Sequence, residues 1–317
     1  MMRHRLLLAA VMLLAAGMPA QAISKNAGTS GSQFLKLGAG SRAGGMGEAF
    51  SAVADDIHAV YYNPAGLTRI TGSQLAASHT ELFQDINYEF AAFAYALGRA
   101  EDHSKHVLAA SIYSLQVSGI ERRAEDTNNP IGNFNAGDYS YNISYGHWLN
   151  PSVSLGITGK LISQRIDSYS SEAFAIDGGL QYRPRPAMQR PLTLSLVIKN
   201  LGSQPKFAGI SDPLPMAFVA GVGYEIMPKR FIIDIDATKY RDTDAFFGIG
   251  GEFRQELRDD IGFALRAGVN THRTSNEGLT EVTAGAGINF HRAAFDFSWV
   301  PFGVLGNTFR YSLILKF

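Results

Sequence analysis

The feature that most constrains this fold is a period of two in the apolar residues, which begins near residue 73 and continues to the last residue. A β-strand points successive side chains to opposite faces, so this period predicts strands with one apolar face. The last strand shows it most clearly, with an apolar row of Phe309, Tyr311, Leu313, Leu315 and Phe317. We count fourteen such strands, over residues 75–79, 93–97, 108–117, 139–145, 153–161, 174–182, 192–198, 218–224, 231–237, 247–253, 261–269, 282–290, 295–299 and 309–317.

The face opposite the apolar rows carries at most one or two charges per strand, diluted by glycine and serine. These charged residues are Lys160, Asp177, Lys199, Asp234, Asp236, Glu252, Arg266, Asp296 and Arg310. The solvated face of a soluble sandwich usually carries more charges, and a propeller would show a repeat of about 40–50 residues that is absent here. The pattern therefore predicts an all-β fold, a transmembrane antiparallel β-barrel of about 14 strands. The rows with Phe297, Leu313 and Phe317 face lipid in this prediction, and the charges face the lumen.

Connection lengths orient the predicted barrel. Connections after even-numbered strands are mostly short, such as 148–152 and 226–230, whereas those after odd-numbered strands include 121–138 and 201–213. Outer-membrane barrels have short periplasmic turns and longer outer loops. We therefore expect both ends of the barrel at the periplasmic side, with the N-terminal segment entering from there. The final aromatic residue, Phe317, resembles the signal that the outer-membrane barrel assembly machinery reads on a last strand.

The first residues have the parts of a secretory signal. Arg3, His4 and Arg5 precede an apolar run over residues 6–16, and Ala20-Gln21-Ala22 fits an A-x-A cleavage site. The run is too short to span about 30 Å of hydrocarbon as a helix. We expect a cleavable signal peptide at residues 1–22 and location in a Gram-negative type outer membrane, in contact with membrane lipid.

Composition and motifs exclude several function classes. The formal net charge is zero, which gives no reason to expect a nucleic-acid partner. The chain has no cysteine, so disulfides and thiol chemistry are excluded. Residues Gly38–Ala43 fit G-x-G-x-x-A, but no buried strand precedes them and no βαβ unit follows. The 8 histidines are scattered, so we predict no cofactor, no metal site and no catalytic residues. A hydrolase with its active site in the barrel wall remains an alternative, because a catalytic triad can assemble from residues on different strands. No motif in the sequence marks a nucleophile for it.

The segment before the strands does not alternate, and we predict a plug, or hatch, at residues 23–72 and a barrel at residues 73–317. Its glycines, with Gly44, Gly45 and Gly47 at the centre, allow close packing of chain on chain. Asn63-Pro64-Ala65-Gly66 predicts a tight turn near the first strand. Asp55 and Asp56 either cap a short helix over 57–62 or pair with lumen cations such as Lys160, Lys199 and Arg266, and we favour the cap.

The same segment resembles a known family. GAGSRAGGMGEAFSAVADD at residues 38–56 and YYNPAGL at 61–67 are similar to the N-terminal signature of the PorV/PorQ group, which are relatives of the FadL-type outer-membrane transporters of hydrophobic compounds. IKNLG at residues 198–202 adds to the likeness. The resemblance implies an outer-membrane barrel with an N-terminal hatch. In this group some members transport hydrophobic solutes and others serve type IX secretion.

The resemblance also suggests a lateral opening in the third strand. FadL-like relatives use a kink there, and the apolar phase of residues 108–112 changes parity at Tyr113. A bulge absorbs such a slip, so we predict a kink at Ser111, Ile112 and Tyr113. The kink either serves only the curvature of the barrel or is a candidate gate. The function that follows is passive binding and uptake of hydrophobic, fatty-acid-like small molecules. The alternative is a non-transport barrel that docks partners or assists secretion.

Overall fold

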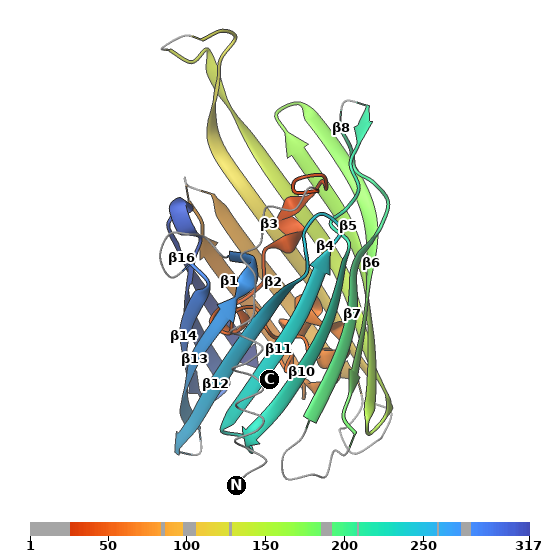
Figure 1. Cartoon of the computed structure of the whole chain (residues 1–317), viewed down its shortest axis with the longest axis vertical. Coiled ribbons are helices and arrows are strands. Elements are labelled where there is room, and N and C mark those ends of the chain that lie inside the picture. The colour runs from red at the N-terminus through yellow and green to blue at the C-terminus, as the bar shows by residue number, and fades with distance from the viewer. Residues whose placement is uncertain are drawn as a thin grey trace.

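The structure is a computed structural model and describes residues 26–83, 86–97, 106–126, 129–184, 192–207, 209–258, 260–273 and 280–317. Fourteen antiparallel strands close into one barrel, in which each strand pairs with its neighbours in sequence and β1 pairs with β16 (Figure 1). They are β1 (Ser73–Glu81), β2 (Asn87–Leu97), β3 (His106–Arg122), β4 (Gly132–Asn150), β5 (Val153–Ile166), β6 (Tyr169–Tyr182), β7 (Leu192–Gly202), β10 (Ala217–Met227), β11 (Phe231–Tyr240), β12 (Phe246–Arg258), β13 (Ile261–Asn270), β14 (Val282–Phe290), β15 (Ala293–Pro301) and β16 (Asn307–Lys316). The predicted strand count and fold class are confirmed.

Two strands lie outside the barrel. β8 (Lys206–Phe207) and β9 (Ile210–Ser211) form a small hairpin in the long connection between β7 and β10, which therefore pair with each other. β3 and β4 are the longest strands, with 17 and 19 residues, and their hairpin projects beyond the rest of the barrel (Figure 1). A membrane-spanning strand needs about 9–11 residues, so part of this hairpin extends past the length needed to cross.

The alternation places side chains as expected. On β16, Leu313 is 42% exposed and points outward, whereas Arg310 is 1% exposed and points inward. Asp234, Asp236 and Arg266 are likewise buried on the inner face. An Arg or Lys facing lipid at the bilayer midplane costs about 2–4 kcal/mol, which explains why the charged rows lie inside.

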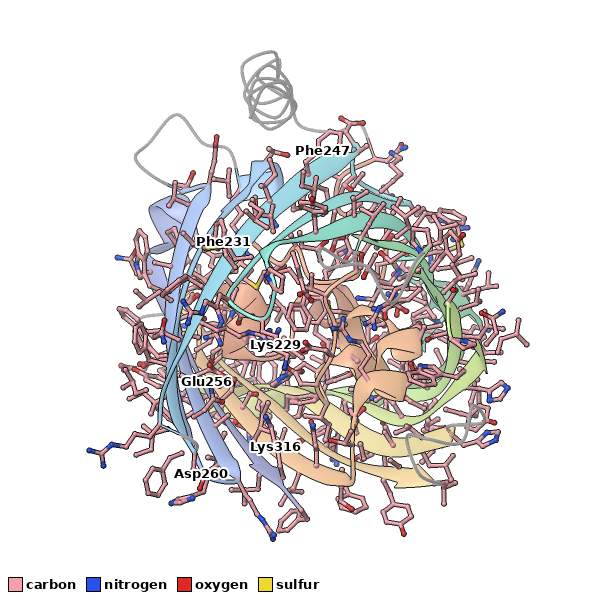
Figure 2. All side chains as sticks on the ribbon, turned by 90° about the horizontal axis from the view of Figure 1, so that it is seen from below. Lys229, Phe231, Phe247, Glu256, Asp260 and Lys316 are labelled. Carbon is pink, nitrogen blue, oxygen red and sulfur yellow. The ribbon has the colours of Figure 1, made fainter. Side chains whose placement is uncertain are left out.

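The N-terminal segment lies within the ring of strands, as the view along the barrel shows (Figure 2). It contains four short helical turns: η1 (Gln33–Lys36), α2 (Ser41–Gly44), α3 (Ala59–Tyr62) and η2 (Pro64–Arg69). Asn63 ends α3 and caps η2, because its side chain accepts a hydrogen bond from Ala65 N (3.1 Å) and Pro64 follows it. Among the residues that the structure describes, no helix is long and apolar enough to cross a membrane.

The described segment runs from one end of the lumen to the other. Gly31 N donates to Pro213 O (2.9 Å) and Lys36 pairs with Asp242 (2.7 Å), both at the end that carries the long connections. At the other end, Ser73 pairs with Phe317 through two backbone hydrogen bonds. We expected the segment to enter from the end with the short turns. The residues before 26 lie outside the described residues, so this expectation stays a prediction. Within the described part, residues 31–36 bind groups at the far end, and the segment joins β1 at the end with the short turns.

The predicted kink in the third strand is also wrong. Ser111, Ile112 and Tyr113 pair without interruption with both β2 and β4, and the register of β3 shifts only between Val117 and Ile120. The side chain of Tyr113 points inward, as the regular alternation of β3 requires. It is an apolar residue on the inner face because a filled lumen, not water, lies opposite it. The gate at this position is therefore withdrawn.

An irregularity does occur between β6 and β7. Their register shifts between Ile176 and Gly178, and Asn200 has a positive φ of 57°. The Asp177 carboxylate accepts a hydrogen bond from Asn200 N (2.7 Å) and pairs with Lys160 (2.6 Å). The IKNLG residues thus form a bulge whose backbone is held by an inward ion pair.

Candidate functional site

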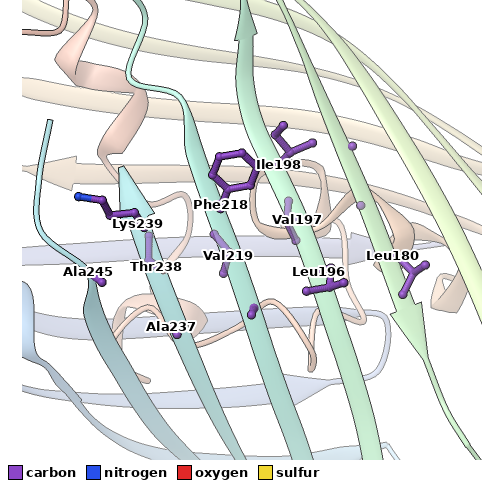
Figure 3. Close-up of a pocket in the computed structure, with 13 residues that line it drawn as sticks. Leu180, Leu196, Val197, Ile198, Phe218, Val219, Ala237, Thr238, Lys239 and Ala245 are labelled. Carbon is purple, nitrogen blue, oxygen red and sulfur yellow. The ribbon is translucent and has the colours of Figure 1, made fainter. Parts of the chain in front are cut away.

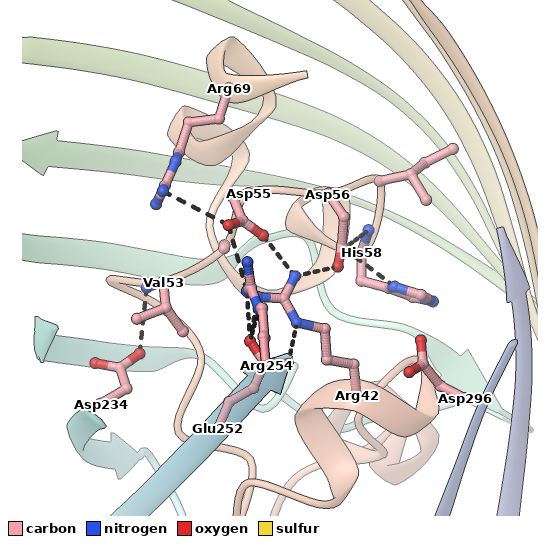
Figure 4. Close-up of polar contacts among 12 residues, drawn as sticks. Arg42, Val53, Asp55, Asp56, His58, Arg69, Asp234, Glu252, Arg254 and Asp296 are labelled. Atoms are coloured by element: carbon pink, nitrogen blue, oxygen red, sulfur yellow. Dashed lines mark hydrogen bonds and ion pairs between the residues drawn. The ribbon is translucent and has the colours of Figure 1, made fainter. Parts of the chain in front are cut away.

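The candidate site is the contact between the N-terminal segment and the barrel wall. At its centre, the guanidinium of Arg42 lies among three carboxylates (Figure 4). Nη1 donates to Asp55 (2.5 Å) and Asp56 (2.6 Å) of the same segment, and Nε donates to Glu252 of β12 (2.9 Å). Arg42 and Glu252 are buried. A guanidinium has five donors in a rigid fork, which is why one residue can bind all three acids.

Further charges surround this centre and balance it. Glu252 also accepts from Arg266 Nε (2.6 Å) and from Arg254, and Arg266 pairs with Asp296 (2.7 Å). Arg69 lies 3.6 Å from Asp55. Paired opposite charges offset the desolvation that burial imposes. We call the residues Arg42, Asp55, Asp56, Arg69, Glu252, Arg254, Arg266 and Asp296 the arginine cluster.

The cluster perturbs the carboxyl groups of the segment. Burial alone would raise the pKa of Asp55, but the charges of Arg42 and Arg69 lower it to about 2. Burial opposes ionisation of Asp56 as well, yet Arg42 and His58 hold its pKa well below the usual value. Both residues are therefore ionised at neutral pH, and their charge binds the segment to Arg42.

Asp56 combines the two roles that we considered as alternatives, whereas Asp55 forms ion pairs with Arg42 and Arg69. Asp56 Oδ1 accepts a hydrogen bond from His58 N (2.9 Å), which caps the turn before α3, while Oδ2 binds Arg42. The cations that we named as partners bind elsewhere: Lys160 pairs with Asp177, Arg266 with Glu252, and the Lys199 ammonium lies 3.5 Å from the centre of the Tyr61 ring. Sequence reasoning missed Arg42 because residues 42 and 55 lie in a segment without a regular period.

Wall carboxylates also bind backbone amides of the segment. Asp236 Oδ2 accepts hydrogen bonds from the N–H groups of Phe50 and Ser51, both at 2.9 Å. Asp234 Oδ2 accepts from Ala52 N (3.2 Å) and Val53 N (3.3 Å). Buried backbone donors outside regular structure need partners. The inward aspartates of β11 supply them.

The predicted glycines lie where backbone meets wall. A Cβ at Gly44 would lie 2.8 Å from Ser298 Oγ, and one at Gly45 would lie 2.9 Å from Gly285 Cα. Gly47 has a φ of 65°, and its Cβ would lie 2.6 Å from Val269 O. Gly66 has no positive φ; it is required because a Cβ would lie 2.4 Å from Ala54 O.

The other side of the segment is apolar. Tyr61 of α3 contacts Tyr113 of β3 edge to face (5.7 Å between ring centres), and Tyr113 stacks on Phe90 of β2 (5.5 Å). Ala92 and Ala109 are buried on the same stretch of wall. We call this contact between α3 and β1–β3 the aromatic contact. The segment thus has a charged side against β11–β16 and an apolar side against β1–β3.

Two cavities flank the segment. A polar cavity of about 810 Å³ opens at the end where β16 ends, and it is lined by the arginine cluster and by wall residues that include Lys229, Glu256 and Lys316 (Figure 2). Toward the opposite end, a cavity of about 40 Å³ is lined by Tyr61, Tyr62, Lys199, Tyr240 and Phe246, among others. The segment therefore separates a wide polar mouth from a small aromatic pocket.

Comparisons with known proteins agree with this fold. The sequence profile of an uncharacterised protein family (UPF0164) matches residues 8–135. None of the curated protein sequences matches the chain. Similar solved structures include the CymD monoaromatic hydrocarbon channel (12% identity, TM-score 0.59, 88% of this chain and 98% of that chain). They also include the Pseudomonas putida toluene transporter TodX (10%, 0.55, 87% and 96%) and a Pseudomonas aeruginosa FadL homologue (11%, 0.53, 88% and 98%). At these identities the likeness establishes the FadL-type barrel fold.

Proposed function

We propose that this chain is an outer-membrane barrel for passive uptake of small apolar molecules, with residues 26–72 as its hatch. The aromatic contact carries the proposal, because rings and small apolar residues of the wall, and not ion pairs, face the segment there. Two of the similar structures, a monoaromatic hydrocarbon channel and a toluene transporter, support the same class of solute. Residues 1–22 are the proposed signal peptide, residues 73–317 form the barrel, and Phe317 is the proposed assembly signal.

In this proposal the charged side of the segment anchors it to the wall, and the apolar side lets the solute pass. On the charged side, ion pairs and backbone hydrogen bonds hold the segment against β11–β16. On the apolar side, Tyr61 donates a hydrogen bond to Leu35 O (3.0 Å) and its ring lies beside the Lys199 ammonium. Tyr113 contacts Tyr61 and Phe90 through its ring, so a rotation of Tyr113 breaks no ion pair. An apolar solute that enters near Tyr240 and Phe246 therefore passes between α3 and β1–β3 while the charged side stays closed to ions.

One observation favours a second candidate function. The β3–β4 hairpin projects beyond the barrel and offers a surface that uptake does not need (Figure 1). A PorV/PorQ-like barrel that docks a partner or assists secretion would use such a surface. In that case the aromatic contact would serve only to hold the segment.

Uptake of a labelled long-chain fatty acid into liposomes tests the first proposal. Liposomes with the protein should accumulate the label faster than empty ones. Ala92→Phe fills the aromatic contact and should bring the rate close to that of empty liposomes. Overpacking costs about 1–3 kcal/mol, so folding is checked by migration of the unheated protein on a gel.

The matched control is Ala267→Phe, the same exchange at an exposed alanine on the outer face of β13. It should leave uptake unchanged. If the folded wild-type protein gives no more uptake than empty liposomes, the transport proposal fails and the docking function remains. If Ala92→Phe transports normally, the solute does not pass along the aromatic contact.

A further inference from the structure

The outer wall of the barrel carries an apolar groove of about 540 Å³ across β6, β7, β10 and β11 (Figure 3). Its floor is low because Gly178, Ala220 and Ala237 occupy outward positions there. Leu196 and Phe218 rise beside it and are 61% and 54% exposed. The groove lies on the opposite face of the wall from the hatch, so uptake through the lumen does not require it.

Strand pairing sets the shape of the groove. Leu196 of β7 lies opposite Ala220 of β10, which lies opposite Ala237 of β11. In the next outward row, Ile198 lies opposite Phe218, and Phe218 lies opposite Lys239. The two small residues therefore lie side by side, and the larger residues of the adjoining rows form the rim.

A single basic residue ends the groove. Of the described residues that line it, Lys239 alone is charged. Its side chain is held at the rim, because Nζ donates a hydrogen bond to the carbonyl of Thr243 in the turn after β11. An ammonium has three donors, so two remain for a ligand. Within the described parts of the chain, no carboxylate forms an ion pair with Lys239.

We propose that this groove binds one acyl chain of a membrane lipid whose phosphate headgroup has a net negative charge, and that this phosphate accepts hydrogen bonds from Lys239. The groove is of the size of small-ligand sites, about 300–1,000 Å³, and an apolar chain fills it without leaving a void against the wall. A peptide would need an open strand edge or a helix groove, and these strands are paired on both sides. A compact ammonium beside an apolar surface matches the join between lipid head and chain.

Native mass spectrometry of the full-length protein in detergent tests the proposal. The protein is incubated with phosphatidylglycerol, whose phosphate leaves a net negative charge, or with phosphatidylcholine of the same chains. We expect one tightly held phosphatidylglycerol, retained about five-fold better than phosphatidylcholine, as one basic residue near an anionic lipid implies. Lys239→Gln should remove the difference, and Lys239→Arg should keep it.

A second pair of variants separates this groove from the rest of the outer surface. Ala237→Phe fills the groove floor and should abolish retention of the lipid, whereas Ala267→Phe, on the outer face of β13, should not. Equal retention by these two variants would overturn the proposal, as would equal retention of the two lipids by the wild-type protein. Fatty-acid uptake is measured in parallel, and normal uptake by Ala237→Phe is expected because the lumen is unchanged.

Discussion

At the scale of single residues, charge compensation inside the lumen decides where the segment lies. Arg42 binds two acids of its own segment and one acid of β12, so a single side chain links the segment to the wall. Breaking a buried pair leaves uncompensated charge, which costs more than the pair itself contributes. For this reason we expect the loss of Arg42 to lower the stability of the folded protein more than the loss of another residue of the arginine cluster.

Arg42→Gln should lower the free energy of unfolding by about 3–5 kcal/mol, the usual cost of removing one partner from a buried ion pair. The matched control is Arg254→Gln, because the Arg254 side chain is 37% exposed and Glu252 keeps its ion pairs with Arg42 and Arg266. The control should cost less than about 1 kcal/mol. Urea unfolding of the refolded barrel gives both values. Equal losses for the two variants would contradict a central role of Arg42.

Stability should also fall at acidic pH through Asp55. An exposed aspartate has a pKa of about 3.9, and Arg42 and Arg69, against burial, lower the pKa of Asp55 to about 2 in the folded protein. Between these values the unfolded state binds more protons than the folded state. The contribution of Asp55 is therefore complete above about pH 4 and is lost as the pH falls toward 2.

The measurement is the urea midpoint between pH 6 and pH 2, for the wild-type protein and for Asp55→Asn. The wild-type midpoint should fall over that range by more than that of Asp55→Asn, which has no such group to titrate. Parallel curves for the two proteins would show that Asp55 does not contribute.

At the scale of elements, glycines on the inner face of the strands let the segment lie directly on the wall. A Cβ at Gly268 of β13 would lie 2.1 Å from Gly47 N, and one at Gly156 of β5 would lie 2.1 Å from Pro64 C. The obstructing atoms are backbone, which cannot rotate away. These glycines therefore let the segment and the barrel wall approach each other closely, much as small residues do where two helices cross closely.

Gly268→Ala should push residues 46–47 off the wall while the barrel still closes. We expect faster amide hydrogen exchange over the N-terminal segment, with little change in β13 itself. Gly159→Ala on β5 is the control, because a Cβ there meets no atom within 4 Å. If the two variants exchange alike, the close approach at Gly268 does not hold the segment in place.

At the scale of the whole molecule, the barrel and the segment are separate in sequence and form one core. The strands bond to one another around a closed ring, so the barrel does not need the segment to satisfy its backbone. The segment, in contrast, takes most of its polar partners from the wall. This asymmetry predicts which part can be removed.

Deletion of residues 33–70 should leave a barrel that assembles but has an open lumen. Liposomes that contain the deletion protein should then admit small sugars in a swelling assay, whereas liposomes with the full chain should exclude them. The same exclusion by both proteins would argue against a hatch. Failure of the deletion protein to insert would show instead that the segment is needed to form the barrel.

The sequence by itself determined the strand count, the inward and outward rows and the closed antiparallel order. A period of two depends only on neighbouring residues in the sequence. Because a charge that faces lipid is costly, the charged row of each strand must face the lumen and the apolar row must face lipid. It also marked the turn at Asn63–Gly66, because a proline and its preceding residue restrict their own backbone angles.

Only the tertiary structure decided how the segment and the wall meet. Arg42 binds Glu252 across 210 residues of sequence, and Asp236 accepts hydrogen bonds from backbone amides of the segment. Tyr113 points inward, where its ring contacts Tyr61. In a water-filled lumen an inward tyrosine would break the pattern, and this led us to predict a kink at Ser111–Tyr113. Which residues of a strand can be apolar on its inner face depends on what fills the lumen. The local period of a strand carries no information about a segment from another part of the chain that packs against it.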